Sequence, residues 1–470
     1  MAVASGQEPV VNAMKQILQK GGSAADAIVA GMTSLWAVNP ILLSATGAGY
    51  FMVNDGSGTF VVDAMASHPF CNRDRDGPIT LEIGMGNAHQ SFHFGKSVSA
   101  PSCLLKALIF LHQKYGKLPW KSLFDPVVQI LEEGVEINDY RKLLIGIFES
   151  VIDEFPTFKK LYSKENGELL GLGDRMHNPK LLEFFKKLSE TPDHNILREC
   201  YQEIELDFED IDFQILEPLK IHFRGKEVLL VPPPNAGGIL VAHSLQELEE
   251  QLSERDSEDF RQELIMKTLE KTMTLRRERV DGNLYDGTIT ESILGNTEHF
   301  SVVDNYGLAI SATASNGTGS AVVCKDSGIL MNNLLGEDDL NPKGFLGEEP
   351  GRRLPSMMTP CMVLEEGRLA YLVGSSGSER IRASIVNVLV NLIVDNMSVE
   401  EAVEKRRIHF DGEKHHIETE VSEDLKEAIG KEIRVWNRSF FFGGCHVVGS
   451  CENSWKAKGD PRRDGQHFVL

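Results

Sequence analysis

Residues 296–304 read Asn-Thr-Glu-His-Phe-Ser-Val-Val-Asp, and this stretch decides how the rest of the chain is interpreted. Its composition predicts a β-strand that opens at Thr297. A second strand is predicted for Gly-Leu-Ala-Ile-Ser-Ala-Thr-Ala-Ser at residues 307–315, with Asn305-Tyr306-Gly307 as the turn between the two. By itself, a threonine at the start of a strand is compatible with any β-sheet protein. Its meaning has to come from the other segments of the chain.

The amino-acid composition limits the classes of protein to which this chain can belong. The chain has 470 residues, of which 41% are hydrophobic and 25% charged, so it supports a sizeable core and is not a disordered polymer. Its formal net charge of −21 excludes nucleic acid or an anionic membrane as the main partner, because both require a basic surface. No run of about 18 apolar residues predicts a membrane span. A small-molecule enzyme or an acidic binding protein remains.

Cysteines and histidines predict neither a disulfide framework nor a metal site. The seven cysteines include no Cys-x-x-Cys pair, so reduced and mostly buried thiols are expected. The close histidine pairs are His89 with His93 and His415 with His416, and no carboxylate or thiolate completes a ligand set. We expect no metal and no cofactor.

The opening residues contain no recognisable export signal. Residues 1–31 lack a basic segment followed by an apolar one, which a signal peptide would require. We therefore expect a cytoplasmic protein, with a leader missing from this sequence as the alternative.

A glycine- and serine-rich turn is a candidate anion site. Leu369–Val373 is a predicted strand, residues 374–379 a loop, and Arg380–Val394 a helix. Backbone amides at a helix N-terminus suit an oxyanion hole, although a plain tight turn is an equally good interpretation.

The remaining pattern predicts a mixture of helices and strands. Helices are expected at residues 10–18, Ala24–Ala37 and from Ile239, with an exposed helical pair at 246–279; strands are expected at Tyr50–Val53, Thr59–Asp63, Gln90–Phe94, Gly328–Met331 and Cys361–Leu364.

Read together, many segments resemble one family. Residues 1–27, 114–137, 231–239, 326–342, 352–360, 373–381, 401–410 and 460–465 follow in order the segments of the γ-glutamyltransferase family (γ-glutamyltranspeptidase, glutathione hydrolase). In this comparison Thr297 matches the start of the small subunit. That family belongs to the N-terminal-nucleophile hydrolases.

The resemblance implies a fold and a maturation step. The expected fold is α+β, a four-layer αββα sandwich of two antiparallel sheets between helices. A proenzyme is expected to cut itself between Asn296 and Thr297. The products, residues 1–296 as large subunit and 297–470 as small subunit, are expected to stay one folded unit.

The implied reaction uses two groups of the new N-terminal residue, its side-chain hydroxyl and its α-amine. The Thr297 hydroxyl is the nucleophile, and its freed α-amine, which titrates near ~8, is a base close to working pH. The expected substrate is glutathione or a related γ-glutamyl amide. An acyl-enzyme forms, and water or an amine or peptide acceptor releases the acyl group.

The same comparison assigns further residues. Backbone amides of Gly377 and Ser378 match the oxyanion hole, where the family usually has two glycines. Expected substrate contacts are Ser356, Asn316 and either Glu337 or Asp338, and the hydroxyl supporting the nucleophile is either Thr313 or Ser315.

Three positions depart from the family pattern. Met65 stands where the family places an arginine that clamps the substrate α-carboxylate, a contact worth ~1.5–3 kcal/mol. Met357 replaces the second serine of a pair. Glu298 follows the nucleophile, either as a solvated strand residue or as a carboxylate that raises the pKa of the Thr297 amine or repels an anionic substrate.

Three functions remain open at this stage. The first is a γ-glutamyl hydrolase or transferase. The second is a related amidase, for instance a glutaryl-type one, whose acyl group carries no α-carboxylate; Met65 would suit it. The third is an uncleaved, inactive member of the family that acts as a binding protein.

Overall fold

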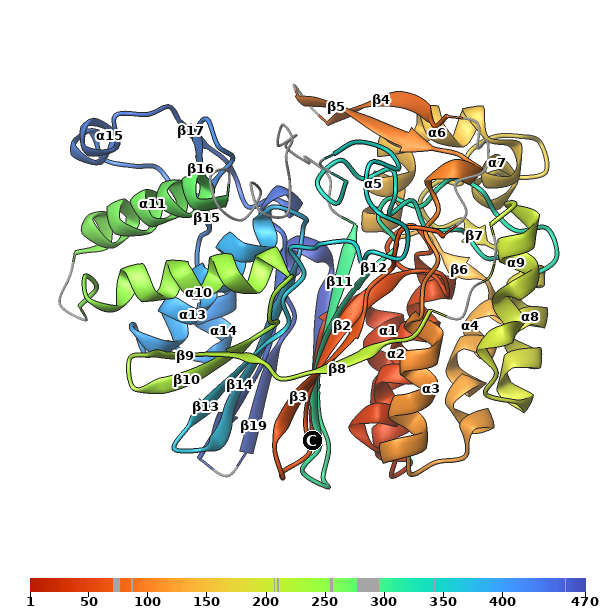
Figure 1. Ribbon diagram of the computed structural model, residues 1–470, viewed down its shortest axis with the longest axis horizontal. Helices are drawn as coiled ribbons and strands as arrows, with labels where there is room; N and C mark the ends of the chain where they lie inside the picture. Colours follow the sequence, from red (N-terminus) through yellow and green to blue (C-terminus); the bar gives the residue numbers. More distant parts are fainter. Residues whose placement is uncertain are drawn as a thin grey trace.

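Two β-sheets form the centre of the molecule, with helices on both sides (Figure 1). The computed structural model describes residues 1–70, 77–85, 88–206, 208, 211–253, 257–276, 296–341, 343–452 and 454–470. The predicted mixture of helices and sheets is confirmed.

The first sheet is antiparallel and joins strands from both ends of the chain. In spatial order its strands are β20 (Gly465–Val469), β1 (Ala2–Gly6), β11 (Thr297–Val303), β12 (Ala309–Ser315), β2 (Ala48–Asn54), β3 (Thr59–Ala64) and β8 (Gln214–Leu216). The N-terminal strand β1 therefore lies between β11 and the C-terminal strand β20, so the proposed large and small subunits share this sheet.

The second sheet is also antiparallel and also draws on both parts of the chain. Its order is β19 (Ser454–Lys458), β18 (Gly444–Cys451), β14 (Arg368–Ser376), β13 (Cys361–Glu365), β10 (Lys226–Leu230) and β9 (Leu219–Phe223). β11 and β12 of the first sheet pack against β14, and β11 also contacts β18, so the two sheets face each other.

Helices cover the outer face of each sheet. On one side lie α1 (Glu8–Gln19) and α2 (Ala24–Val38), which pack on β1, β11 and β12. On the other lie α10 (Ala236–Glu249) and α13 (Arg380–Ile393), which contact β9 and β14. Figure 1 shows these helix pairs to the right and left of the sheets.

Smaller elements surround this centre. The further helices are α3 (Leu104–Tyr115), α4 (Asp125–Glu133), α5 (Asp139–Ile147), α6 (Glu149–Glu154), α7 (Pro156–Tyr162), α8 (Pro179–Glu190), α9 (Arg198–Glu203), α11 (Glu258–Leu275), α14 (Val399–Glu404) and α15 (Glu423–Ile429). The further strands are β4 (Ile79–Met85), β5 (Ala88–Phe94), β6 (Val135–Glu136), β7 (Arg175–Met176), β15 (Ile408–Phe410), β16 (His415–Ile417) and β17 (Ile433–Val435). Within the described ranges, no helix is both long and apolar enough to cross a bilayer.

The period of two along β11 decides which side chains lie between the sheets. Phe300 and Val302 belong to the apolar cluster that includes α1 and α2, whereas Val303 belongs to the cluster between the sheets. Thr297 and Ser301 each lie an even number of positions before Val303. Their side chains therefore lie on the same face of the strand as that of Val303. The strand therefore directs the Thr297 side chain away from the α1 and α2 side.

Capping explains why α2 begins where it does. The Ser23 hydroxyl accepts a hydrogen bond from the Asp26 amide at 3.1 Å, and the Asp26 carboxylate accepts one from the Ser23 amide at 2.9 Å. This capping box satisfies two amides that the first helical turn leaves without partners.

Three predicted elements differ from the structure. β14 runs on through Ser376, because residues 374–376, expected as loop, pair with β18. Gly328–Met331 is no strand and contributes only an isolated bridge between Leu330 and Val323. The expected exposed helical pair is the end of α10 plus α11, and α11 buries Leu264, Met266 and Leu269; residues 254–256 and 277–279 lie outside the described residues.

Candidate active site

Thr297 opens β11 beside the last residue of β12. The two strands pair in register, with Thr297 opposite Ser315. The Ser315 hydroxyl donates a hydrogen bond of 2.6 Å to the carbonyl oxygen of Asn296, the group that precedes Thr297. Ser315 in turn accepts a hydrogen bond from the Gly317 amide at 3.0 Å. The peptide bond between Asn296 and Thr297 is thus held with its carbonyl already hydrogen-bonded.

A small pocket lies next to this bond. Its volume is about 40 Å³, little more than the space of one water molecule. The wall is formed by Asn296, Thr297, Ser315, Gly317, Leu334, Glu337, Asp339, Leu340, Ser356, Met357, Met358, Ser378 and Ile381. Of the residues predicted from the sequence, the pocket therefore brings together Asn296, Thr297, Ser315, Glu337, Ser356 and Ser378.

Two carboxyl groups line the pocket, Glu337, which is buried, and Asp339, which is half-buried. Burial raises the pKa of Glu337 to about 8, and the neighbouring Asp339 carboxylate adds to the shift. Burial and the nearby Glu379 carboxylate raise the pKa of Asp339 to about 6. No lysine or arginine is among the described residues of the wall. The pocket is therefore a place where a positive charge would be favoured over a negative one.

Asp339 is a pocket residue that sequence reasoning missed. The prediction named Glu337 or Asp338, but the Asp338 carboxylate lies 3.3 Å from His93 Nε2 and is not part of the wall. The Asp339 carboxylate instead accepts a hydrogen bond of 3.0 Å from the Ser378 hydroxyl. Adjacent acidic residues diverge here, and only the folded loop decides which one faces inward.

Ser378 adopts a conformation that normally favours glycine. Its φ is +50°, and that of Gly377 is +114°. A side chain at φ > 0 costs about 1–2 kcal/mol, and the hydrogen bond to Asp339 offsets this. The Arg380 and Ile381 amides donate to the carbonyls of Gly377 and Ser378 at 3.0 Å, so the amides of Gly377 and Ser378 precede the first bonded turn of α13. Such amides lack acceptors within the helix and suit an oxyanion.

The segment carrying Ser356 is fixed by the turn before α10. Ser356 Oγ accepts from the Met358 amide at 3.0 Å, and the Gly237 amide donates to the Ser356 carbonyl at 3.1 Å. A Cβ at Gly237 would lie 2.2 Å from the Met357 carbonyl oxygen, so only glycine permits this contact. Met357, which replaces a serine of the family pattern, is also part of the pocket wall.

Besides Asp338, the predicted residues Gly377, Asn316 and Thr313 are absent from the pocket wall. Asn316 is fully buried, and its side chain bonds Ser44 Oγ at 2.9 Å and the Pro40 carbonyl at 3.3 Å. The Thr313 hydroxyl bonds His299 Nδ1 at 2.8 Å. Of the two hydroxyls considered as support for Thr297, it is Ser315 that lies beside it.

Met65 is a core residue, and an arginine lies at its backbone. The Met65 side chain is fully buried. Arg353, more than 280 residues later in the chain, donates to the Met65 carbonyl at 2.9 Å and lies 3.3 Å from Asp63. The guanidinium of Arg353 is engaged by Asp63, and Arg353 is absent from the pocket wall. Arg353 therefore does not restore a carboxylate clamp at the pocket.

Glu298 is neither solvated nor part of the pocket, which corrects the expectation of a solvated strand residue. It is 2% exposed. Its Oε1 accepts hydrogen bonds from the Gly6 amide at 3.1 Å, the His299 amide at 3.0 Å and His446 Nε2 at 3.0 Å. Since His446 Nδ1 accepts from the Asp460 amide at 3.0 Å, its proton lies on Nε2. Glu298 thus ties β1, β11 and β18 together.

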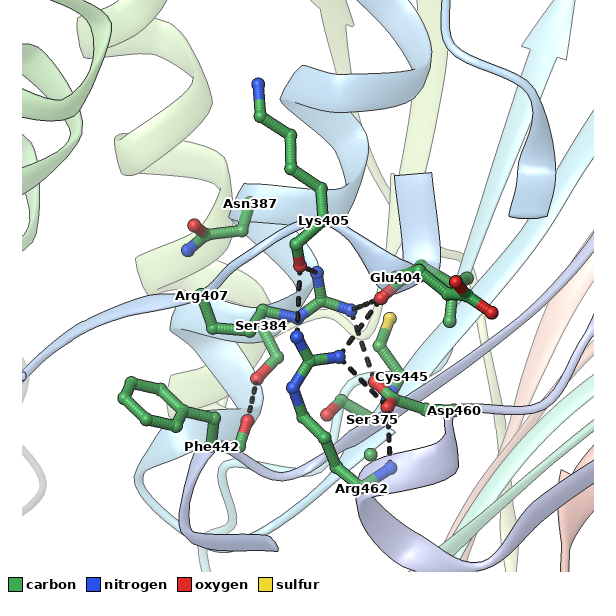
Figure 2. A network of polar contacts seen from close by, with 12 residues as sticks. Ser375, Ser384, Asn387, Glu404, Lys405, Arg407, Phe442, Cys445, Asp460 and Arg462 are labelled. Atoms are coloured by element: carbon green, nitrogen blue, oxygen red, sulfur yellow. Dashed lines mark hydrogen bonds and ion pairs between the residues drawn. The ribbon is translucent and has the colours of Figure 1, made fainter. Parts of the chain in front are cut away.

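Behind Glu298 lies a closed network of charges (Figure 2). Asp460 accepts from Arg407 at 3.2 Å, from Arg462 at 3.0 Å and from the Cys445 amide at 3.0 Å. Arg462 also binds Glu418, with Nε 2.9 Å from Oε1. Burial opposes ionisation of Asp460, but the two guanidinium groups outweigh it and lower its pKa. These contacts join Arg407, Glu418 and Cys445 to the C-terminal segment that carries Asp460 and Arg462.

Metal ligands do not gather in the described structure. Within those ranges, no three histidine, cysteine, aspartate or glutamate side chains lie close enough to hold an ion. The side chain of His89 lies outside the described residues, and its predicted partner His93 contacts Asp338.

Comparison with known proteins gives the same picture. The family model described as Gamma-glutamyltranspeptidase matches residues 11–279 and 254–470. The glutathione hydrolase proenzyme of Pseudomonas aeruginosa is 26% identical over 87% of this chain and 82% of its own length. The acylase ACY 1 proenzyme of Pseudomonas sp. strain V22 is 24% identical, over 95% of this chain and 90% of its own.

A solved structure extends the likeness to the whole fold. The cephalosporin acylase of Bacillus halodurans superimposes with a TM-score of 0.84 at 18% identity, over 100% of this chain and 95% of the other. Fold and family match together define the class of protein, a hydrolase of the N-terminal-nucleophile type. Within this class, the chain belongs to the γ-glutamyltranspeptidase family.

Proposed function

We propose that this chain is a self-processing amide hydrolase or acyltransferase that cuts itself before Thr297 and then uses Thr297 to accept a γ-glutamyl group. The observation that carries the proposal is the Ser315 hydrogen bond to the Asn296 carbonyl, next to the Thr297 side chain and the pocket. The two facing sheets with helices outside correspond, in this proposal, to the αββα sandwich of the class.

Self-cleavage follows from this geometry. The Thr297 Oγ attacks the Asn296 carbonyl carbon, and Ser315 stabilises the charge on the carbonyl oxygen. The C–N bond breaks, and Asn296 is left as an ester on Thr297. Water hydrolyses the ester to give the Asn296 carboxylate and a free Thr297 amine. Residues 1–296 and 297–470 stay together because both contribute strands to both sheets.

Removal of the Asn296 linkage would open the pocket for substrate. Asn296 is part of the wall, and the uncut chain leaves about 40 Å³. After the cut, Thr297 Oγ attacks the substrate amide while its α-amine takes up the proton. Amides of Gly377 and Ser378 stabilise the oxyanion, the leaving amine departs, and water or an acceptor amine releases the acyl group.

The two pocket carboxyl groups favour a γ-glutamyl group over a glutaryl group. A γ-glutamyl group carries an ammonium that ionised Glu337 and Asp339 would attract. A glutaryl group would instead bring a carboxylate toward them, with no arginine or lysine on the described wall. The α-carboxylate of a γ-glutamyl donor would have hydroxyl and amide partners, such as Ser356, rather than a cation.

The second candidate is an acylase whose acyl group has an amine but no α-carboxylate. The buried Met65 and the engagement of Arg353 by Asp63 favour it. Relatives of this chain include an acylase proenzyme as well as glutathione hydrolase proenzymes.

Three anilides separate these candidates. Turnover of γ-glutamyl, 4-aminobutyryl and glutaryl anilides should be compared, with Thr297→Ala as the inactive control. We expect the glutaryl compound to be slowest. A cationic clamp is worth about 10- to 100-fold, so without one the γ-glutamyl compound should lead the 4-aminobutyryl compound by less than 10-fold. A faster 4-aminobutyryl compound would establish the second candidate, and a fastest glutaryl compound would contradict both.

A further inference from the structure

Two cysteine thiols meet across the proposed cut, far from the pocket. Cys200 lies on α9, in the part that precedes Thr297, and Cys324 lies in the segment after β12. The Cys324 thiol points at the Cys200 carbonyl, with Sγ 3.8 Å from the oxygen, and the two thiols are close enough for each to shift the pKa of the other. Cys200 Sγ lies 3.1 Å from Ser327 Oγ.

The backbone holds the two segments together around these thiols. The Lys325 amide donates to the Glu203 carboxylate at 2.9 Å, and Asn178 Nδ2 donates to the Gly328 carbonyl at 2.8 Å. Each bond joins a residue before Thr297 to one after it. The thiols are therefore placed by contacts on both sides of them and do not depend on one another for their position.

A cavity gives small molecules access to the pair. Its volume is about 490 Å³, and its wall includes Cys200 and Cys324. Although each cysteine is only 2% exposed, the wall also includes Lys187 and Lys325, which are exposed at the surface. The other charged groups of the wall are Glu199, Glu203 and Asp326.

The two thiols differ in acidity. Hydrogen bonds from Cys324 and Ser327 lower the pKa of Cys200 against the effect of burial. The hydrogen bond to Cys200, together with burial, raises the pKa of Cys324. Cys200 is therefore the first of the pair to become a thiolate, which is the nucleophile in thiol–disulfide exchange.

We propose that Cys200 and Cys324 form a dithiol–disulfide couple whose oxidised form covalently joins the segments 1–296 and 297–470. The Cys200 thiolate attacks one sulfur of a low-molecular-weight disulfide, forming a mixed disulfide and expelling one thiolate. Cys324 then loses its proton and attacks the Cys200 sulfur, which expels the second thiol. In sum, two protein thiols and one small disulfide give one protein disulfide and two small thiols.

A second described pair of cysteines would not give this link. Cys361 and Cys445 are buried near each other, but both follow Thr297, so their oxidation would not join the two segments. Cys451 is exposed and is the described cysteine most prone to cross-link separate molecules. Cys71 lies outside the described residues. A Cys451→Ser background therefore removes the main interfering reaction, and Cys361→Ala is the matched control.

The joining of two chains rests on the proposed self-cleavage, so the test has two arms. In the first, the Cys451→Ser protein is treated with bis(2-hydroxyethyl) disulfide, blocked with N-ethylmaleimide and run on denaturing gels. We expect one band near 52.2 kDa without reductant and two smaller bands with it. Cys200→Ala and Cys324→Ala should give two bands under both conditions, and Cys361→Ala should behave like its parent.

The second arm does not depend on cleavage. The same oxidation is applied to Thr297→Ala in the Cys451→Ser background, and proteolytic peptides are examined by mass spectrometry. A peptide containing Cys200 linked to one containing Cys324 is expected, in at least half of the molecules. If both cysteines instead stay free in the folded protein, the proposal is overturned. A single band in the first arm under both conditions, together with the linked peptides, would contradict self-cleavage alone.

Discussion

The molecule contains two groups of buried carboxylates that are treated in opposite ways. At Asp460, two arginines supply charge and hydrogen bonds and lower its pKa (Figure 2), and Arg462 also pairs with Glu418. At Glu337 and Asp339, the described wall holds no cation, the nearby Arg276 only partly offsets the effect of burial at Asp339, and the pKa values rise to about 8 and about 6. Glu337 is buried like Asp460 and Glu418, so the difference between them lies in the partners of each carboxylate.

This contrast distinguishes carboxylates with a structural role from carboxylates at a functional site. A buried carboxylate with a structural role is paired with a cationic side chain of the same protein, because an unpaired buried charge is costly. A buried carboxylate without a counter-charge destabilises the protein until a ligand supplies that charge. Groups of this kind are common at functional sites. This contrast supports the proposal that the pocket beside Thr297 binds a positively charged group.

The largest effect on stability is expected from breaking the arginine network. Arg462→Met leaves Asp460 and Glu418 buried with fewer partners, which should lower the free energy of unfolding by about 3–5 kcal/mol. Chemical denaturation monitored by circular dichroism measures this. The control is Arg368→Met on an exposed position of β14, expected within about 0.5 kcal/mol of the parent. Equal effects of the two substitutions would mean that the network contributes nothing special.

Glu298 provides a carboxylate satisfied by neutral donors. Glu298→Ala leaves the amides of Gly6 and His299 and the His446 ring N–H without an acceptor, which should cost about 2–4 kcal/mol. Glu298→Gln keeps an acceptor and should cost less than half as much. The same denaturation experiment compares them, and a glutamine variant as unstable as the alanine variant would show that the charge, rather than hydrogen bonding, is what matters.

The pocket carboxylates predict a pH dependence of substrate binding. Because their pKa values are raised, both are protonated at low pH and become negative as the pH rises through about 6 and about 8. The KM for a γ-glutamyl anilide should therefore fall over this range. Asp339→Asn should raise KM about 10-fold at pH 8, by the loss of one charged contact, and remove the lower step of the profile.

The control for this prediction is Asp338→Asn, since Asp338 lies outside the pocket wall beside His93. It should leave KM and its pH profile unchanged. Should Asp338→Asn rather than Asp339→Asn shift the profile, the assignment of the inward-facing carboxylate would be wrong.

The smallest effect concerns the turn at Ser378. Ser378→Ala loses the hydrogen bond to Asp339 and keeps a side chain at positive φ, whereas Ser378→Gly loses the bond but relieves the backbone. The glycine variant should be about 1 kcal/mol more stable than the alanine variant. Thermal unfolding of the two proteins provides the comparison, and an alanine variant of equal or greater stability would exclude backbone strain at this position.

Much of the fold was accessible from local sequence patterns. The amphipathic residues 10–18 lie within α1, and the predicted pair of strands around Asn305-Tyr306-Gly307 corresponds to β11 and β12. Local sequence patterns did not predict strand ends that depend on pairing with a strand far away in the sequence. β14 extends through Ser376 because β18, about 70 residues later, supplies its hydrogen bonds, and no signal near Ser376 announces this.

The site was predictable only in part for the same reason. The family resemblance pointed to Thr297, Ser356 and Glu337, which line the pocket. It gave no means to choose Asp339 over Asp338, because the folded path of the loop decides the direction of each side chain. Likewise, Arg353 meets Met65 and Asp63 only in three dimensions.

Ser315 offers a direct test of the proposed self-cleavage geometry. If its hydroxyl stabilises charge on the Asn296 carbonyl oxygen, Ser315→Ala should slow the cut by about 10²- to 10³-fold, the usual cost of one oxyanion donor. Thr313→Val, on the same strand but bonded to His299, should slow it far less. Equal rates for Ser315→Ala and the parent would remove Ser315 from the mechanism.

The most direct measurement is the intact mass and N-terminal sequence of the purified protein. The account predicts two chains, residues 1–296 and 297–470, with a new N-terminus that reads Thr-Glu-His-Phe, and a single uncut chain for Thr297→Ala. A wild-type protein that stays a single chain of 52.2 kDa after long incubation would contradict self-cleavage at Thr297.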